Sequence, residues 1–320
     1  MGYNEAMLHA VFSDIHGNLP ALEAAIADAK AHGALSFLFI GDYFRDFPWP
    51  NEVADTIRSL DVKTAVKGNN ERYIETLLKR GQAEKPVGQM SLIDWNFSLL
   101  APEAIDFFRS LPDEETICDE GAAIRLEHIS GIFSRAPKIG LFTSSGFRRA
   151  MEAKKFTHGE YLANAREALL GDPGAAADLD GLPDGIYLFG HNHLQFHMRH
   201  GGKLFINPGS CGLALDYDQT AAYALLDVRS KDEFYVTERR VKYDYISAAS
   251  AVKNSSLALR SPVWRDLVVK TLLGASECMT SLLVLAAEEA KRRGKTCWPV
   301  DDETWEAAAS RWRQNELANG

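Results

Sequence analysis

Short apolar runs alternate with helical patterns over the first 70 residues, and this alternation restricts the chain to a small set of folds. Leu8–Ser13 and Ser36–Ile40 are apolar runs with the length of buried strands. Between them, apolar side chains recur at helical spacing over Leu22–Ala29, and Gly33 marks the end of that pattern. A strand–helix–strand unit of this kind predicts an α/β fold with a largely parallel sheet.

The pattern continues to about residue 241, interrupted by two segments of different character. Residues 72–117 are expected to be mainly helical. Residues 133–181 form a less regular insertion, with a helix over Gly159–Leu170 and a stretch rich in Gly, Ala and Asp over Gly171–Gly181. We therefore expect one domain over residues 1–244 that carries both insertions. The other expected elements are helices over Val53–Leu60, Ile74–Lys79, Leu92–Leu100 and Ala104–Leu111, and strands over Val62–Val66, Ala122–His128, Ile186–Phe189, Leu204–Ile206, Ala221–Val228 and Glu233–Val241.

Residues 245–320 are expected to form a helical C-terminal extension. One long helical segment is predicted from about Val263 to Arg293, and a final helix is predicted around Glu303–Leu317. Trp305 and Trp312 are seven residues apart and would share one face of that final helix. Packing of this face onto the rest of the chain is the favoured interpretation. A homodimer interface through the C-terminal helices is the specific alternative.

Composition argues against several functional classes. The formal net charge is −9, so no basic surplus exists for broad nucleic-acid binding. No run of about 18 apolar residues is present, which argues against a membrane span. The four cysteines form no CxxC pair, and the N-terminus has no signal-peptide pattern. We expect a cytoplasmic protein with reduced cysteines.

Metal-binding residue types stand directly after five of the expected strands. The C-terminal ends of parallel strands meet at one edge of a sheet, so these side chains are expected to converge. Asp, His and Asn side chains bind the metal ions that activate water for attack on phosphorus. Gly190–His193 is the sharpest signal, because Gly-His-x-His rarely arises by chance. The five segments are Asp14-Ile15-His16, Asp42, Asn69-Asn70, His128 and His191-Asn192-His193.

These residues belong to a series of short motifs: Ser13-Asp14-Ile15-His16-Gly17-Asn18, Gly41-Asp42, Gly68-Asn69-Asn70-Glu71, His128, Gly190-His191-Asn192-His193 and Asn207-Pro208-Gly209-Ser210. The series resembles the motifs of calcineurin-like metallophosphoesterases. The run Asp14–Leu22 is especially similar to the bacterial branch related to diadenosine tetraphosphatases and small phosphodiesterases. The resemblance covers about residues 8–241 and does not include the C-terminal extension.

The resemblance implies a sandwich of two central sheets flanked by helices, to which the C-terminal helices are an appendage. It also implies two divalent metal ions, and family members commonly hold Mn, Fe or Zn. Asp42 would bridge both ions, and Asn207–Ser210 would form a supporting loop near the site. The implied ligands are Asp14, His16, Asp42 and His193 for one ion and Asp42, Asn69, His128 and His191 for the other.

Asn70 departs from the family pattern, in which this position is commonly a histidine proposed to protonate the leaving oxygen. Asn70 can donate a hydrogen bond but cannot act as a general acid near pH 7. The resemblance places Asp42, Asn70 and His128 in the catalytic set and leaves the proton donor open, with His158 or His197 as alternatives. General acid catalysis typically contributes about 10²–10⁴-fold, so its loss favours good leaving groups, such as nucleotides leaving from a polyphosphate, or aryl phosphates.

Two arginines close to these motifs are candidates for contact with a substrate phosphate. Arg45 follows Asp42 by three residues and Arg72 follows Asn70 by two, and Asn70 itself is the third candidate. For Arg45, plain packing of the loop is an equally favoured alternative.

These expectations favour a dinuclear-metal-dependent phosphoesterase that acts on phosphodiester or phosphoanhydride bonds of a small, nucleotide-like substrate. A metal-activated hydroxide would be the nucleophile. A phosphomonoesterase or a Ser/Thr protein phosphatase is the runner-up. A catalytically weak, metal-bound scaffold, as in the phosphoesterase-like subunit of the retromer coat, is the alternative from another class. A nuclease is disfavoured by the acidic balance.

Overall fold

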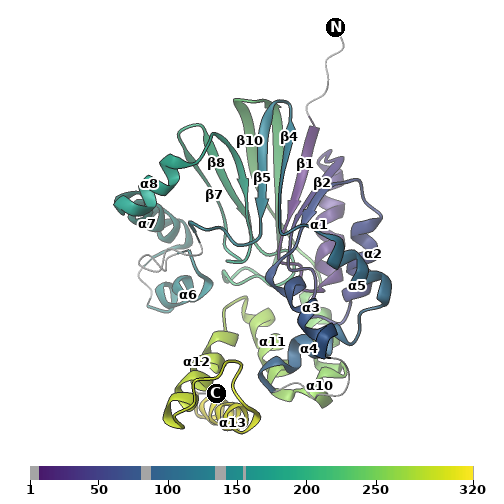
Figure 1. The fold of residues 1–320 in the computed structure, drawn as a ribbon, viewed down its shortest axis with the longest axis vertical. Coiled ribbons are helices and arrows are strands. Elements are labelled where there is room, and N and C mark those ends of the chain that lie inside the picture. Colours follow the sequence, from purple (N-terminus) through teal and green to yellow (C-terminus); the bar gives the residue numbers. More distant parts are fainter. Residues whose placement is uncertain (1–6, 81–87, 134–141, 154–155, 320) are drawn as a thin grey trace.

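The computed structural model describes residues 7–80, 88–133, 142–153 and 156–319. Within these ranges the strands form two five-stranded sheets that pack face to face (Figure 1). The first sheet has the order β10-β9-β1-β2-β3 and the second has the order β4-β5-β6-β8-β7. The strands are β1 (Met7–Phe12), β2 (Ser36–Ile40), β3 (Val62–Val66), β4 (Glu114–Asp119), β5 (Ala122–Glu127), β6 (Gly185–Leu188), β7 (Gln195–His200), β8 (Lys203–Pro208), β9 (Ala221–Ser230) and β10 (Glu233–Val241).

Each sheet is parallel at its centre and antiparallel toward an edge. In the first sheet β1, β2 and β3 are parallel, while β9 is antiparallel to β1 and β10 is antiparallel to β9. In the second sheet β5, β6 and β8 are parallel, and the edge strands β4 and β7 are antiparallel to their neighbours. The two-sheet α/β fold is therefore confirmed, with sheets that are mixed in direction.

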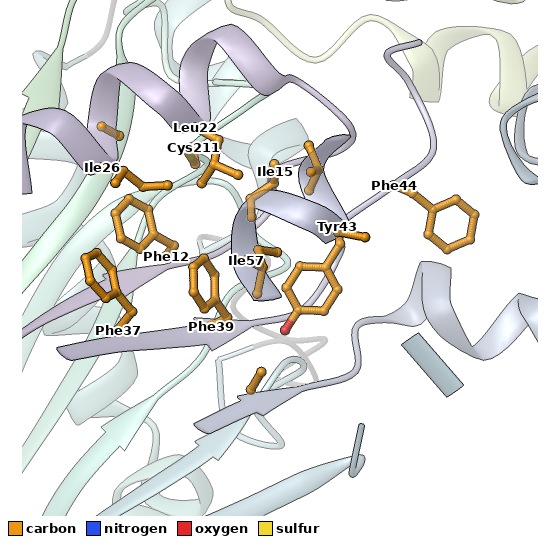
Figure 2. Packing of buried hydrophobic residues seen from close by; sticks show 14 of the residues in the cluster. Phe12, Ile15, Leu22, Ile26, Phe37, Phe39, Tyr43, Phe44, Ile57 and Cys211 are labelled. Carbon is orange, nitrogen blue, oxygen red and sulfur yellow. The ribbon is translucent and has the colours of Figure 1, made fainter. Parts of the chain in front are cut away.

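Both faces of the central strands β1 and β2 are buried, which explains why these two strands are nearly continuous apolar runs. Val11 and Leu38 point between the two sheets, whereas Phe12 and Phe39 point to the opposite side. On that opposite side, the rings of Phe12 and Phe39 pack with Leu22 of the first helix (Figure 2). The rings of Phe12 and Phe39 have centroids 5.4 Å apart.

Helices cover the outer faces of both sheets. Figure 1 shows α1, α2 and α5 beside the first sheet and α7 and α8 beside the second. None of the helices in the described part of the chain is long and apolar enough to span a bilayer. The helices are α1 (Leu19–Ala31), α2 (Pro50–Arg58), α3 (Asn69–Arg80), the 3₁₀ turn η1 (Gly88–Met90), α4 (Ser91–Phe97), α5 (Pro102–Ser110), α6 (Ser144–Glu152), α7 (His158–Gly171), α8 (Pro173–Gly181), α9 (Tyr245–Asn254), α10 (Leu257–Arg260), α11 (Pro262–Gly274), α12 (Met279–Arg292) and α13 (Asp302–Asn319).

The structure differs from the sequence expectations in three segments. The end of the 72–117 segment, expected to be helical, contains the edge strand β4. The stretch Gly171–Gly181 ends in a regular helix, because Asp172 caps it by accepting a hydrogen bond from the backbone N–H of Ala175. The long helical segment predicted from Val263 is two helices, since Ala275 adopts left-handed backbone (φ 43°) after α11.

The C-terminal helices share one hydrophobic cluster with parts of the main domain, here named the C-terminal cluster. Trp305 is 1% exposed and Trp312 is 6% exposed, which confirms that their shared face packs within the chain. Trp305 stacks on Trp264 with ring centroids 5.2 Å apart. The buried members of the cluster that precede residue 245 are Phe47, Leu92, Trp95, Leu213 and Leu215.

Candidate metal centre

The residues expected to bind metal lie where strands end. Within each sheet, the strands that precede these residues run parallel, so their C-terminal ends meet at one edge. The residues follow the strands in order: Asp14 and His16 after β1, Asp42 after β2, Asn69 after β3, His128 after β5, and His191 and His193 after β6.

Asp14 lies among three imidazoles. Its Oδ1 is 3.3 Å from Nε2 of His193 and 3.9 Å from Nε2 of both His16 and His128. Asp14 is fully buried, and its Oδ1 accepts no hydrogen bond from the residues that the structure describes. A buried carboxylate oxygen without a partner is costly unless a cation or a proton compensates its charge. This orphaned oxygen therefore fits a metal ligand.

Asp42 faces two groups of ligands with its two oxygens. Oδ1 is 3.5 Å from Nε2 of His128, and Oδ2 is 3.9 Å from Nε2 of His16. The backbone N–H of Asn70 donates to Oδ1 at 2.9 Å and fixes the carboxylate. This orientation fits a carboxylate shared between two cations.

The remaining ligands divide between the two sides of Asp42. Nε2 of His16 lies 3.3 Å from Nε2 of His193. On the other side, Oδ1 of Asn69 lies 3.2 Å from Nε2 of His128 and 2.9 Å from Nδ1 of His191. The first half of the site is named here as Asp14, His16, Asp42 and His193, and the second half as Asp42, Asn69, His128 and His191.

Five of the seven residues expected to bind metal have left-handed backbone, which is uncommon for residues other than glycine. Each such conformation costs of order 1–3 kcal/mol and clusters at functional sites when the surroundings enforce it. The site therefore holds backbone strain that ordinary loops do not need. The five residues are Asp14 (φ 55°), His16 (φ 57°), Asp42 (φ 55°), His191 (φ 69°) and His193 (φ 56°).

Backbone hydrogen bonds hold the loops after β1 and β2 together in this conformation. The N–H groups of Asp14 and His16 donate to the carbonyl oxygens of Gly41 and Asp42, at 3.1 and 2.9 Å. The turn after β6 approaches equally closely, because a Cβ on Gly190 would stand 1.9 Å from Oγ of Ser13. The glycine before His191 is thus a steric requirement of the site.

Three imidazoles are oriented by acceptors at Nδ1. The carbonyl oxygen of Ile40 lies 2.6 Å from Nδ1 of His128, and the carbonyl oxygen of Leu213 lies 2.6 Å from Nδ1 of His193. Because a carbonyl oxygen can only accept, both Nδ1 atoms must carry the proton, which leaves Nε2 free to bind a cation. The third acceptor is a carboxylate, Oδ2 of Asp46, at 2.5 Å from Nδ1 of His16.

Sequence reasoning gave no role to Glu71 or Asp46, although both belong to the site. The carboxylate of Glu71 accepts the backbone N–H groups of Asp42 and Tyr43, both at 2.9 Å, and of Gly68 at 2.7 Å. Burial and then the charge of Asp42 raise the pKa of Glu71 to about 7. The only sequence signal was proximity, since Glu71 and Asp46 stand two and four residues after Asn69 and Asp42.

The electrostatics of the site fit divalent cations. Burial alone raises the pKa of Asp14, but the imidazoles of His193 and His16 hold it well below its usual range. Burial lowers the pKa of His16, yet the charge of Asp46 and the nearby carboxylate of Asp14 outweigh it and raise the pKa to about 10. Likewise Asp42 overcomes burial and raises the pKa of His128 to about 9. Positive charge is therefore favoured here, and carboxylate, imidazole and amide donors suit Mn, Fe or Zn.

The three residues expected to contact substrate have different surroundings. Asn70 is 1% exposed, and its Nδ2 donates to the carbonyl oxygen of Phe44 at 3.2 Å. Arg72 is half exposed and pairs with Asp113 at 2.9 Å. Arg45 is half-buried in the loop after Asp42 and has φ 147°; within the described residues it makes no hydrogen bond or ion pair.

The two histidines considered as alternative proton donors do not join the ligand cluster. His158 begins α7 and packs against Phe147 of α6, with ring centroids 4.9 Å apart. His197 lies on β7 and pairs with Glu238 at 2.7 Å on the exposed side of the strand. Neither histidine forms a described hydrogen bond or ion pair with an expected metal ligand, and a role as proton donor stays a prediction for both.

Comparison with known proteins gives one family and several relatives. The model of the calcineurin-like phosphoesterase superfamily domain matches residues 7–231. The uncharacterized protein MJ0912 of Methanocaldococcus jannaschii is 28% identical over 273 residues, which cover 80% of this chain and 94% of that protein.

Solved structures show the same fold at low sequence identity. The metallophosphoesterase from Sphaerobacter thermophilus superimposes with a TM-score of 0.57 at 19% identity, covering 84% of this chain and 99% of that chain. The hypothetical protein PH1004 from Pyrococcus horikoshii gives a TM-score of 0.55 at 18% identity, covering 85% and 100%. The family model spans most of this chain, including all the ligand residues described above. The chain therefore belongs to the calcineurin-like phosphoesterase superfamily and is a metal-dependent phosphoesterase.

Proposed function

We propose that the chain hydrolyses a phosphodiester or phosphoanhydride bond of a small, nucleotide-like substrate at a centre of two divalent cations. The observation that carries the proposal is the position of Asp42, whose Oδ1 faces His128 and whose Oδ2 faces His16. The first half and the second half of the site would each hold one cation, of Mn, Fe or Zn.

Two cations bound there would supply a hydroxide nucleophile at neutral pH and neutralise charge on the phosphoryl group. Among the described residues, the side chains of Ser13, Ser210 and Cys211 near the site are unsuited to act as nucleophiles. Oγ of Ser13 donates to the carbonyl oxygen of Ile40, and Oγ of Ser210 donates to that of Asp14. Cys211 is buried, and burial raises the pKa of its thiol. These groups support a direct attack by water without a covalent enzyme intermediate.

Arg45 is proposed to bind a substrate phosphate. Its guanidinium makes no hydrogen bond or ion pair with the described residues, although its charge helps to lower the pKa of the neighbouring Asp46. An arginine whose N–H groups are not engaged in this way suits bidentate recognition of phosphate oxygens beside a phosphoesterase centre. Arg72 is a weaker candidate, because Asp113 already neutralises it.

Asn70 supports the proposal that the hydrolysed bond is an anhydride or an activated diester. The site offers an amide where an acid would be needed to protonate an alkoxide, and the amide is engaged by Phe44. Nucleotide phosphates and aryl oxides leave as weak bases and need no protonation. This argument favours anhydrides and activated diesters over alkyl phosphomonoesters or phosphoserine peptides.

The test begins with metal-depleted protein, reloaded separately with Mn²⁺, Fe²⁺ and Zn²⁺. Each form is assayed on dinucleoside polyphosphates, cyclic nucleotides, aryl diesters, alkyl monoesters and phosphopeptides. We expect metal-dependent turnover of anhydrides or diesters that Asp42→Asn abolishes. Asp119→Asn is the control and should retain turnover, because Asp119 pairs with His9 near the start of β1, away from the strand ends that carry the site. Turnover of monoesters or phosphopeptides alone would overturn the substrate class. Stoichiometric metal without any turnover would indicate a scaffold.

The location and assembly of the protein are part of the proposal. All four cysteines are free thiols, which supports a reducing, cytoplasmic location. A homodimer through the C-terminal helices is supported by apolar side chains exposed there, such as Leu259 (89% exposed) and Ile246 (57% exposed). Light scattering on the full chain tests the dimer, which a monomeric mass at micromolar concentration contradicts.

A further inference from the structure

His16 is the one site imidazole whose Nδ1 faces a carboxylate within the described part of the chain. Oδ2 of Asp46 lies 2.5 Å from Nδ1 of His16, and Asp46 is completely buried. The backbone N–H of Asp46 donates in turn to the carbonyl oxygen of His16 at 3.1 Å. Two bonds therefore join these residues, one through the side chains and one through the backbone.

Folding alone does not explain the burial of Asp46. Oδ1 of Asp46 is buried and accepts no hydrogen bond from the described residues, so a stable core would gain little from this carboxylate. Nε2 of His16, on the other side of the ring, faces Oδ1 of Asp14 and Oδ2 of Asp42, each at 3.9 Å. The imidazole thus stands between a buried carboxylate and the first half of the site.

The other imidazoles have weaker supports. His128 and His193 rely on neutral backbone carbonyls, and Nδ1 of His191 faces Asn69, itself a ligand. A carboxylate behind a histidine fixes its tautomer and ring orientation and makes the imidazole a stronger donor to metal, while a carbonyl oxygen adds less negative charge. Among the described residues, the first half of the site therefore has a buried carboxylate directly behind one of its imidazoles, and the imidazoles of the second half have none.

We infer that Asp46 is a positioning residue for His16 and makes the two cation sites unequal, with tighter binding in the first half. The inference rests on the proposed dinuclear centre but concerns metal binding and not turnover. Removal of a carboxylate behind a ligating histidine typically weakens metal binding roughly 10–100-fold. The loss should be confined to the first half.

The experiment measures Mn²⁺ and Zn²⁺ binding to the full chain by calorimetry, with competing chelators for the tighter class. Two backgrounds isolate the halves: Asn69→Ala removes a ligand of the second half, and His193→Ala removes a ligand of the first. We expect Asp46→Asn to weaken binding roughly 10–100-fold in the Asn69→Ala background and less than about twofold in the His193→Ala background. Asp119→Asn, in the buried pair with His9, is the matched control and should change neither.

Equal losses in both backgrounds, or no loss in either, would overturn the inference. Because no assay of turnover enters, an inactive protein with unequal sites would contradict the proposed function alone. A variant that does not fold leaves a direct measurement on the wild-type protein. In the Zn²⁺ form, nitrogen-15 NMR of His16 should show a protonated, exchange-protected Nδ1 and a metal-bound Nε2. A metal-bound Nδ1, or an unprotected one, would refute the role of Asp46.

Discussion

Leu213 contacts the candidate metal centre with its backbone and the C-terminal helices with its side chain. Its carbonyl oxygen accepts a hydrogen bond from Nδ1 of His193 at 2.6 Å, and its side chain is buried in the C-terminal cluster. Any shift of the cluster that moves this backbone therefore also moves His193, a proposed metal ligand.

Leu213→Ala should lower both stability and metal affinity. A buried leucine replaced by alanine typically loses about 2–5 kcal/mol in the free energy of unfolding. Leu282→Ala is the matched control, because Leu282 is fully buried in the same cluster. We expect similar losses in urea denaturation for both variants but weaker metal binding only for Leu213→Ala. Unchanged metal affinity in both variants would show that packing of Leu213 in the C-terminal cluster does not affect metal binding.

Glu71 should be essential for the turn that presents Asp42. Glu71→Ala leaves three buried N–H groups without an acceptor, and each such group costs about 1–3 kcal/mol. We expect a loss of at least about 3 kcal/mol in chemical denaturation, together with loss of metal binding. Glu75→Ala, four residues on in α3, removes an exposed ion pair to Arg109 and should stay within about 1 kcal/mol of wild type.

Arg45→Gly should separate stability from substrate binding. Glycine adopts φ 147° readily, so the variant should unfold no more easily than wild type and should gain up to about 1 kcal/mol. If Arg45 binds a phosphate, KM should rise at least about tenfold with metal affinity unchanged. Arg72→Gly is the comparison and should leave KM within about twofold. A KM that Arg45→Gly leaves unaltered would assign Arg45 to loop packing.

Asn70→His should restore a proton donor and change the preference among leaving groups. A general acid contributes about 10²–10⁴-fold, chiefly for poor leaving groups. The ratio of kcat/KM for alkyl over aryl phosphate esters should therefore increase. Asn70→Ala loses the bond to Phe44 without gaining an acid, so the same ratio should stay constant. If the histidine does not move the ratio, the argument from leaving groups is wrong.

Metal binding should release protons at neutral pH. In the metal-free protein the pKa of His16 is raised to about 10 and that of His128 to about 9, so both rings are protonated at pH 7.5. A cation must displace these protons, and its affinity should rise with pH until about pH 9–10. Calorimetry in buffers of different ionisation enthalpy should give a release of about two protons. A release near zero would place neutral imidazoles in the metal-free site.

The same protons should make the metal-free protein less stable at high pH. For both histidines the folded pKa lies above the usual 6.5, so their contribution to stability is complete below pH 6.5 and is lost as the pH rises through about 9–10. Thermal unfolding of the metal-free form should therefore move to lower temperature between pH 7 and 10.

Much of the fold was predictable because burial on both faces gives central strands an unmistakable pattern. β2 begins and ends where its apolar run does. The sequence does not predict β4, because β4 is an edge strand whose residues Glu114–Thr116 are exposed, so pairing with β5 and not local composition decides its structure. The break at Ala275 was equally hidden, since it depends on a hydrogen bond from the distant N–H of Tyr217.

The candidate site, like the fold, was predictable only in part. Its ligands follow strands, and the strand pattern is local, so the sequence placed them in order. Asp46 and Glu71 act through partners 30 and 29 residues away, and only the packing of two loops brings each carboxylate to its acceptor position. The sequence shows that these two carboxylates are present, but it does not show which groups they bind.

The left-handed backbone at five ligands has a consequence for how this enzyme can be probed and can change. At Asp14 or His191, replacement by alanine or a β-branched residue removes a proposed metal donor and also disfavours the left-handed backbone of the turn. A measured loss of activity would then combine both effects. Asparagine is both tolerant of this backbone and close in size, which makes it the cleaner probe. For the same reason, natural drift at these positions should pass through Asn, Asp or Gly before any other residue.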